Sequence, residues 1–466
     1  MSEHYQGTRL PQDVTVGSLR DITRDYETMV VTVMQAIADR HNRWPDYPYV
    51  NTKLDLITGQ DFPEDDPIKG KGAIYGWIQG RALESLVGHC RWLRDRETRP
   101  DRKIGADLVP RLEEMMRGLF GKLMEIRQGH GGRLRFFMTP DGDPFVLDDA
   151  GRPTSATEET PYGFSDIFGC KGLLAAAAYL EDRAGFGEAM TYCREIDTAI
   201  HERRFENDQV ALDPKNPVEP TPGKHPHGPY MIQIGTAALL AGLGEAMSVE
   251  MGLKLIRYEL ENHVNVFGRI PRLQAFDFWE NIDDEGKPYL DDGKIVSDPG
   301  HALECVGLIL KFTSAVTAND LATSAQAREI GEIERTMPRI LERNFRNGFR
   351  PGPGGVVKAY DLKARETINS DMPWWPLPET MRSAALCLKA CDGDGDREMC
   401  LGVLRDCHNA FVGGFVRPDL HLMSYQTRDE DGRPVPVIPA SADADPGYHT
   451  GLSIVDMLDV IREVAP

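Results

Sequence analysis

Apolar residues recur at steps of three and four along most of the chain, the spacing that places them on one face of an α-helix. The run that contains Leu173, Ala176, Ala177 and Leu180 is a clear example. Pro338 falls inside one such run and predicts a kink or a break there. The spacing predicts about twelve helices, at Ser18–Arg40, Tyr75–Leu93, Leu108–Gln128, Phe164–Asp182, Gly187–Arg204, Tyr230–Leu243, Val249–His263, Gly300–Thr313, Leu321–Asn344, Glu379–Cys391, Asp396–Ala410 and His449–Val464.

The connectors between these helices alternate in length. After the even-numbered helices the chain turns back within few residues, as at Ala184–Gly185, whereas after the odd-numbered helices it runs through long segments rich in Gly and Pro. Ordered connections have a median of about 4–6 residues, so the long ones are where function or extra structure is expected. Two of them predict β-hairpins, Leu134–Leu147 around Asp141-Gly142 and Phe415–Ile438 around Asp431-Gly432.

Antiparallel helices with alternating short and long turns carry all their long turns at one end. Six such hairpins close into a ring with an inner and an outer layer. The fold class we predict is therefore all-α, an (α/α)6 barrel with small β-hairpin insertions on the active-site rim. Residues 1–17 would be an N-terminal extension and residues 18–466 a single catalytic domain. An open solenoid of helical hairpins is the alternative, but no fixed sequence period supports one.

The composition narrows the classes of partner. The 466 residues carry 53 Lys and Arg against 73 Asp and Glu, which gives a formal net charge of −20. Nucleic acids and anionic membranes need a positive face, so we expect neither as a partner and favour a small neutral substrate. The eight cysteines show no paired spacing, and no run approaches ~18 apolar residues, so we expect a cytoplasmic protein.

Polar side chains gather where the even-numbered helices begin. His301 and Glu304 stand three apart at the start of the eighth helix, and a carboxylate beside an imidazole orients it and raises its pKa, as a general base requires. His449 opens the twelfth helix, and two imidazoles on opposite sides of a pocket suit proton transfer to either face of one carbon. Arg81 would hold a sugar oxygen as charge develops on it. The structural alternatives are histidines at ordinary helix starts and an arginine in an ion pair.

Other patterns carry less chemistry. Trp374 and Trp375 precede the tenth helix, where they would either pack on a pyranose ring or fill a core. No two carboxylates stand out as a pair for glycoside hydrolysis. His225-Pro226-His227 lacks further residues at ligand spacing, so we expect no metal site.

Five motifs resemble those of the N-acylglucosamine 2-epimerase superfamily of (α/α)6-barrel enzymes. That group includes N-acylglucosamine 2-epimerase, cellobiose 2-epimerase and aldose–ketose isomerases acting on mannose or sulfoquinovose. The motifs follow the family order from Tyr75 to Val464. They are Trp77-Ile78-Gln79-Gly80-Arg81, Phe278-Trp279-Glu280, Pro299-Gly300-His301-Ala302-Leu303-Glu304, Trp374-Trp375-Pro376 with Glu379, and Tyr448-His449.

By position, the resemblance implies two acid/base histidines, His301 and His449, with Glu304 supporting the first. It implies a further set of substrate-binding residues: Arg81, Trp374, Trp375, Glu379, Tyr75, Glu280 and His227. The family commonly places a His after Pro-x-Met near the start of the sixth helix, and this chain has Ile232 there. His225 or His227 would be the substitutes available in the preceding loop.

The function we expect is cofactor-independent interconversion of an aldose and its ketose by histidine-mediated proton transfer at C2 through an enediolate. Since the C1 carbonyl accepts the charge, neither a redox carrier nor a metal is needed. Sugar 2-epimerisation of the N-acylglucosamine or cellobiose type is the first alternative, and an (α/α)6 glycoside hydrolase is the second. A helical scaffold for protein partners is the non-enzyme alternative. The partner we expect is a small-molecule sugar that the sequence does not identify, and a homodimer stays open.

Overall fold

The computed structural model describes residues 5–97, 107–148, 151–156, 161–209, 221–391 and 393–464. These ranges hold all twelve predicted helices, with ends that differ by a few residues. Pro338 lies within the ninth helix, which continues past it without a break. The helices are α1 (Val16–His41), α2 (Gly76–Glu97), α3 (Leu108–Gly129), α4 (Phe164–Tyr179), α5 (Arg183–His201), α6 (Gly228–Gly242), α7 (Met247–Asn262), α8 (Pro299–Ala318), α9 (Ser324–Gly348), α10 (Pro376–Ala390), α11 (Asp394–Gly414) and α12 (Ser453–Val464).

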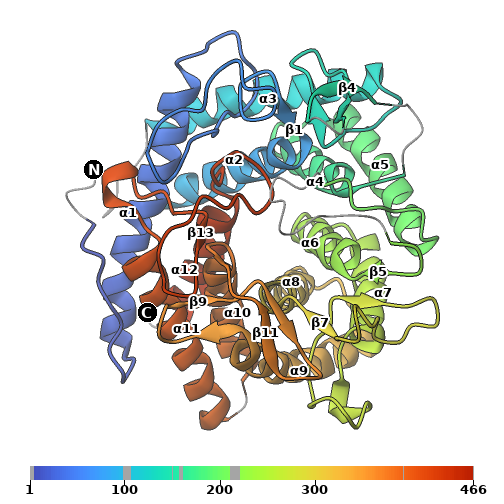
Figure 1. Ribbon diagram of the computed structural model, residues 1–466, viewed down its shortest axis with the longest axis vertical. Helices are drawn as coiled ribbons and strands as arrows, with labels where there is room; N and C mark the ends of the chain where they lie inside the picture. The colour runs from blue at the N-terminus through green and yellow to red at the C-terminus, as the bar shows by residue number, and fades with distance from the viewer. Residues whose placement is uncertain are drawn as a thin grey trace.

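The even-numbered helices form an inner ring and the odd-numbered helices surround it (Figure 1). Neighbouring inner helices pack in chain order, from α2 on α4 through to α10 on α12. A π-helical turn, η4 (Tyr448–Leu452), precedes α12 and packs on α2, which closes the ring. The fold is therefore the (α/α)6 barrel that the alternating connectors predict.

Inner and outer helices bury different shares of their surface. In α6, every residue from Gly228 to Ala238 is buried, because an inner helix meets neighbours on all sides. The outer helix α9 buries mainly one apolar stripe, which includes Ile330, Ile333, Met337 and Leu341. The two layers thus follow from how far apolar residues extend around each helix.

The long connectors pair with one another through short antiparallel strands, which places them at one end of the barrel. Strands of different connectors pair in β1–β2, β5–β6, β7–β10 and β12–β13, whereas β3–β4, β8–β9 and β10–β11 pair within one connector. The strands are β1 (Ile74–Tyr75), β2 (Phe137–Met138), β3 (Phe145–Leu147), β4 (Pro153–Ser155), β5 (His225–Pro226), β6 (Asn281–Ile282), β7 (Val296–Ser297), β8 (Phe349–Arg350), β9 (Gly355–Val356), β10 (Ala359–Asp361), β11 (Glu366–Asn369), β12 (Met372–Pro373) and β13 (Thr427–Arg428).

Both predicted β-hairpins turn back where expected. Met138 bridges Pro144 across one turn, and Arg428 bridges Pro434 across the other. Their strands, however, extend by pairing with other connectors, β2 with β1 and β13 with β12. This cross-pairing ties successive hairpins of the barrel together.

Two features bear on where the protein resides. Helix α8 is the one helix in the described ranges long and apolar enough to cross a membrane, yet 67% of its apolar window is buried inside the protein, as in a core helix. The eight cysteines, all within the described ranges, are free thiols. A cytoplasmic location stays a prediction.

Candidate active site

A cavity of about 180 Å³ opens at the end of the barrel that carries the long connectors. Its wall is built mainly from the residues that begin the inner helices. The N-terminal ends of these helices carry the positive ends of their dipoles. The lining includes Trp77, Arg81, Phe164, Phe168, Met231, Ile232, Glu280, His301, Glu304, Lys358, Trp374, Trp375 and His449.

His301 stands in the first turn of α8 and is tied to carboxylates on one side of its ring. Asp298 caps the helix by accepting hydrogen bonds from the backbone N–H groups of Gly300 at 3.0 Å and His301 at 3.4 Å. Nδ1 of His301 donates to Glu280 Oε1 at 3.0 Å. A carboxylate only accepts, so Nδ1 carries a proton and Nε2 is left for chemistry. Burial disfavours the charged ring, but Asp298 and Glu280 outweigh it and raise the pKa of His301.

Glu280 lies between two imidazoles, because His227 Nε2 is 3.3 Å from its other oxygen. Burial alone would raise the pKa of Glu280, yet the neighbouring His301 and His227 hold it well below its ordinary value. Glu280 is therefore an anion. The chain brings it to the site on an irregular connector rather than on a helix.

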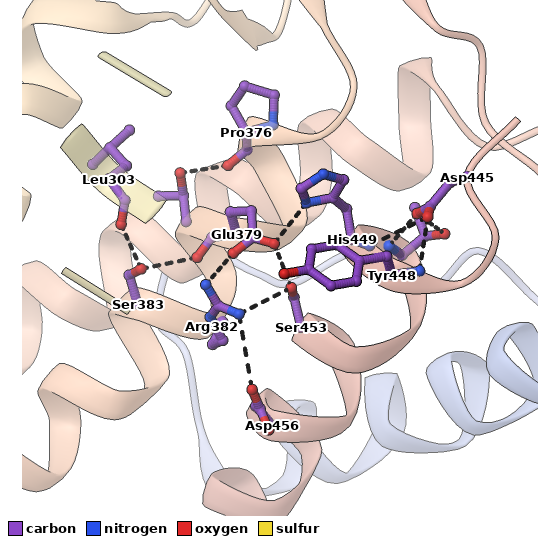
Figure 2. A network of polar contacts seen from close by, with 12 residues as sticks. Leu303, Pro376, Glu379, Arg382, Ser383, Asp445, Tyr448, His449, Ser453 and Asp456 are labelled. Atoms are coloured by element: carbon purple, nitrogen blue, oxygen red, sulfur yellow. Dashed lines mark hydrogen bonds and ion pairs between the residues drawn. The ribbon is translucent and has the colours of Figure 1, made fainter. Parts of the chain in front are cut away.

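His449 has an equivalent anchor on the far side of α10. Its Nδ1 donates to Glu379 Oε1 at 2.8 Å, and Ser453 Oγ donates to the same oxygen at 2.6 Å. Arg382 pairs with the other oxygen of Glu379 (Figure 2). Burial opposes the charge on Glu379, but Arg382 and the hydrogen bond from His449 lower its pKa to about 2.

Local sequence explains how His449 is presented. Gly447 has φ +81, a left-handed conformation that glycine adopts at little cost, and the chain then enters the π-helical turn. Asp445 accepts from the backbone N–H groups of Tyr448 at 2.7 Å and Thr450 at 2.6 Å (Figure 2). These bonds satisfy the start of η4 and fix the residue between them, His449.

Glu304 does not support His301 in the way that its position three residues later predicts. The carboxylates on Nδ1 of His301 are Glu280 and, at 3.5 Å, Asp298. Glu304 instead has its carboxylate within 4.8 Å of ligand atoms of both Glu379 and His449. Shared helical face does not require contact, and the folded connector brings Glu280 closer. Burial, and then the charge of Glu379, raise the pKa of Glu304.

Arg81 is held by aromatic rings rather than by an ion pair. Its guanidinium carbon lies 4.1 Å from the ring centroid of Phe168, 5.3 Å from that of Tyr448 and 5.5 Å from that of Trp77. Its Nε is buried without a hydrogen-bond partner, and within the part of the chain described here Arg81 pairs with no carboxylate. Arg81 also lines the cavity, so its guanidinium is available to an oxygen of a ligand.

Trp375 connects the two histidines. Its ring lies nearly parallel to that of His301, with centroids 5.3 Å apart and an interplanar angle of 29°, and 5.7 Å from the ring of His449. Trp374 meets His449 edge-on at 6.2 Å. Both indoles line the cavity, so they offer the aromatic surface that the sequence predicts for a sugar.

Three of the predicted substrate-binding residues do not line the cavity. Tyr75 is fully buried in β1, and its hydroxyl donates to the carbonyl of Ile68 at 3.0 Å. Glu379 lies behind His449, and His227 lies behind Glu280. Motif position predicted these residues, but only the fold shows that they lie behind the side chains that line the cavity.

Neither of the two substitutes expected for an imidazole after Pro-x-Met, His225 and His227, lies on the cavity wall. Ile232 lines the cavity at that position. His227 is 0% exposed, and His225 lies 2.7 Å from Asp284 outside the cavity lining. This part of the cavity is therefore apolar.

Two contributors were missed at the level of sequence. Lys358, from the connector between β9 and β10, lines the cavity and reaches Asp298 at 2.6 Å. No local pattern marks it. Arg382 could have been found, since it stands three residues after Glu379 on one helical face.

Two groups of three ligand atoms lie within 4.8 Å of one another in the described ranges, His227 with Glu280 and His301, and Glu304 with Glu379 and His449. In each group a histidine Nδ1–H already donates to a carboxylate. Of the two ring nitrogens, Nε2 is therefore the one left either to exchange protons or to bind a cation.

No protein-family model matches the chain, and no curated protein matches its sequence. Solved structures do match. A cellobiose 2-epimerase from Bacillus thermoamylovorans B4167 has a TM-score of 0.64 at 11% identity, over 94% of this chain and 99% of that one. The cellobiose 2-epimerase from Spirochaeta thermophila DSM 6192 has a TM-score of 0.63 at 13% identity, over 97% and 99%. A D-mannose isomerase has a TM-score of 0.60 at 10% identity, over 91% and 97%.

The chain has the fold of these sugar epimerases and isomerases. The likeness spans nearly the whole of each compared chain. The resemblance first noted in five short motifs is thereby confirmed at the level of the fold. At this identity, function has to be argued from the cavity itself.

Proposed function

We propose that this chain is a sugar isomerase that interconverts an aldose and its ketose by proton transfer at C2. The observation that carries the proposal is that His301 and His449 line one cavity, each with Nδ1 hydrogen-bonded to a carboxylate. Such an arrangement fixes the tautomer and leaves Nε2 as the atom that exchanges protons.

The size of the cavity favours a single sugar unit. Its volume of about 180 Å³ is below the roughly 300–1,000 Å³ of sites for drug-sized ligands. One ring fits this space more readily than a disaccharide. This supports a monosaccharide substrate, and it therefore favours the proposed isomerase over a 2-epimerase of the cellobiose type.

The chemistry follows from the groups on the wall. An imidazole Nε2 removes the proton from C2 of the open-chain aldose, and the electron pair moves through C1 to the carbonyl oxygen. Arg81 and the helix N-termini stabilise the resulting enediolate. The proton is then delivered to C1, while the C2 hydroxyl gives its proton to O1, which leaves the C2 carbonyl of the ketose. Atoms and charge balance without a redox partner.

Sugar 2-epimerisation is the second candidate, and one feature favours it. His301 begins α8 and His449 precedes α12, with Trp375 between their rings. Two acid/base groups from different walls allow the proton to return to C2 from the opposite side. The same enediolate serves both outcomes, so the difference lies in which carbon faces the second imidazole.

Proton NMR in D2O with a panel of reducing aldoses tests the proposal. Deuterium incorporated during conversion to a ketose supports isomerisation, and a 2-epimer labelled at C2 supports the second candidate. The variants His301→Asn and His449→Asn should each lose most turnover while remaining folded. Release of sugars from an oligosaccharide without any exchange would instead establish a hydrolase and overturn both.

A further inference from the structure

Behind the cavity wall, ionisable side chains form a chain of alternating carboxylates and imidazoles that ends at His301. Glu259 Oε2 lies 3.5 Å from His227 Nδ1, and His227 Nε2 lies 3.3 Å from Glu280 Oε2. Glu280 Oε1 in turn accepts from Nδ1 of His301 at 3.0 Å. The reaction described above uses only the last two members.

The pair formed by His227 and Glu259 is buried away from solvent. His227, at the N-cap of α6, and Glu259, on α7, are both 0% exposed. A buried ion pair is costly, and apolar residues of similar size often stabilise a core as well or better. Stability therefore gives no reason to keep this pair, whereas its contact with Glu280 does.

His227 carries the positive charge of this pair. Burial disfavours a charged ring, but Glu259 and Glu280 outweigh it and raise the pKa of His227 to about 10. His263, whose ring centroid is 5.6 Å from that of His227, has its pKa lowered to about 3 by burial and by the His227 charge. Among the described groups facing Glu280 from behind, His227 is thus the cation.

We propose that His227 is a positioning residue of the acid/base site: clamped by Glu259, it keeps the Glu280 carboxylate ionised and directed at Nδ1 of His301. The contact geometry stands by itself, and only the effect on turnover rests on the proposed function. His227 does not reach the cavity, so it acts through Glu280 alone.

The direction of the effect follows from the charges around His301. Its neighbours are Glu280 from the α7–α8 connector, Asp298 and Glu304 from α8, Lys358 from the β9–β10 connector, and His227, whose ring centroid is 5.8 Å away. Without His227, the Glu280 carboxylate loses the neighbour that keeps it ionised and directed at Nδ1 of His301, so its stabilisation of the charged His301 ring weakens. The pKa of His301 should therefore fall.

Histidine-selective NMR titration of the full chain gives a readout independent of turnover. In the unaltered protein, the ring of His227 should remain protonated to pH ~9. In His227→Gln, the midpoint of His301 should fall by about one pH unit, on the scale of a weakened charge pair at this distance. With an active sugar, kcat should fall about 10–100-fold, as for other residues that orient a reacting group, with KM changed less than about twofold.

The chain offers a matched control two residues away. His225→Gln removes an imidazole that contacts Asp284 at the surface, and it should change neither the titration of His301 nor turnover. Should His227→Gln fail to fold, Glu259→Gln keeps the shape of the pair, and the ring of His227 should then titrate below its value in the unaltered protein.

The outcomes separate this proposal from the proposed function. A His301 midpoint in His227→Gln that stays unchanged or rises, or a His227 ring that is neutral at pH 7, overturns the positioning role whatever sugar is turned over. A His301 midpoint that falls in a protein with no isomerase or epimerase activity supports the positioning role and rejects the proposed function.

Discussion

Glu379 and Arg382, three residues apart on α10, form an ion pair directly behind the imidazole of His449 (Figure 2). Arg382 is buried, and its Nη1 also lies 3.4 Å from Ser453 Oγ and 3.9 Å from Asp456 Oδ2. The anchor of His449 is thus one end of a network that continues into α12. The stability of this network and the orientation of the His449 ring are therefore coupled.

Replacing Arg382 with Met should destabilise the protein by about 3–5 kcal/mol, because the variant leaves the Glu379 charge buried without its cation. Chemical denaturation at pH 7 measures the loss. Lys389→Met is the control, since the Lys389 pair with Glu463 at 2.7 Å is largely exposed and should cost under about 1 kcal/mol. Equal effects of the two substitutions would show that the network carries no special weight.

Arg81→Lys should lower kcat by roughly 10²–10³-fold with little change in the thermal midpoint. The planar guanidinium rests on Phe168 and Tyr448, and a lysine ammonium does not reproduce that stacking or the two-pronged contact to an oxygen anion. Steady-state kinetics with the sugar identified by NMR gives the comparison. Retention of near-normal kcat would remove Arg81 from the mechanism.

Gly451→Ala should disturb the turn that carries His449. A methyl group at this position would lie 2.5 Å from Nε2 of His89, a fully buried ring, so η4 has to shift. We expect a loss of about 1–3 kcal/mol and a lower kcat. Gly402→Ala, which meets nothing within 4 Å on α11, should instead gain about 0.5–1 kcal/mol. Thermal unfolding and turnover of both variants decide the matter.

Stability should fall on mild acidification. Burial lowers the pKa of His89 and of His408 to about 4 and that of His263 to about 3, against 6.5 when unfolded. The unfolded chain therefore binds protons first, so stability is complete above pH 6.5 and declines as the pH falls toward 4, by about 2 kcal/mol for each ring at pH 5. Urea unfolding at pH 7 and pH 5 tests this, and equal stabilities at both would contradict it.

The opposite sign applies to His227. Its pKa is raised to about 10, so its contribution to stability is complete below pH 6.5 and is lost as the pH rises through 10. The variant His227→Gln should lack this alkaline decline. Urea unfolding at pH 7 and pH 10 compares the two proteins, and parallel curves would argue against a buried cation at this position.

Treatment with EDTA should leave activity unchanged, because the proposed proton transfer needs only side chains, with Nδ1–H of each histidine held by a carboxylate and Nε2 exchanging the proton. Added Zn²⁺ should inhibit, since the ligand atoms of both histidine–carboxylate groups lie within 4.8 Å of one another and a cation competes with the proton. Initial rates after chelation and after metal addition provide the test. Loss of activity on chelation, restored by one metal, would replace acid/base chemistry with metal chemistry.

The barrel could be predicted because its signal is repeated. Helical spacing recurs twelve times, and the alternation of connectors places the functional end before any side chain is considered. His301, His449 and Arg81 followed, since they begin inner helices and line the cavity as expected. Local spacing and topology contain this information.

Contacts that depend on the folding of the long connectors could not be predicted from the sequence. Glu280 and Lys358 arrive on irregular segments, and nothing in their spacing indicates that they would meet Asp298 or His301. Glu304 was linked to His301 because both share a helical face, yet a connector residue took that place. Tyr75, Glu379 and His227 belong to recognisable motifs, but depth behind a wall is a property of packing that a motif does not encode.

The inner ring closes where η4 meets α2, and η4 also carries His449. A nascent chain that has emerged as far as α11 therefore has an open wall beside α2 and half of its acid/base pair. Under the proposed mechanism, such a chain is catalytically silent on the ribosome. Completion of the barrel and the start of turnover therefore coincide.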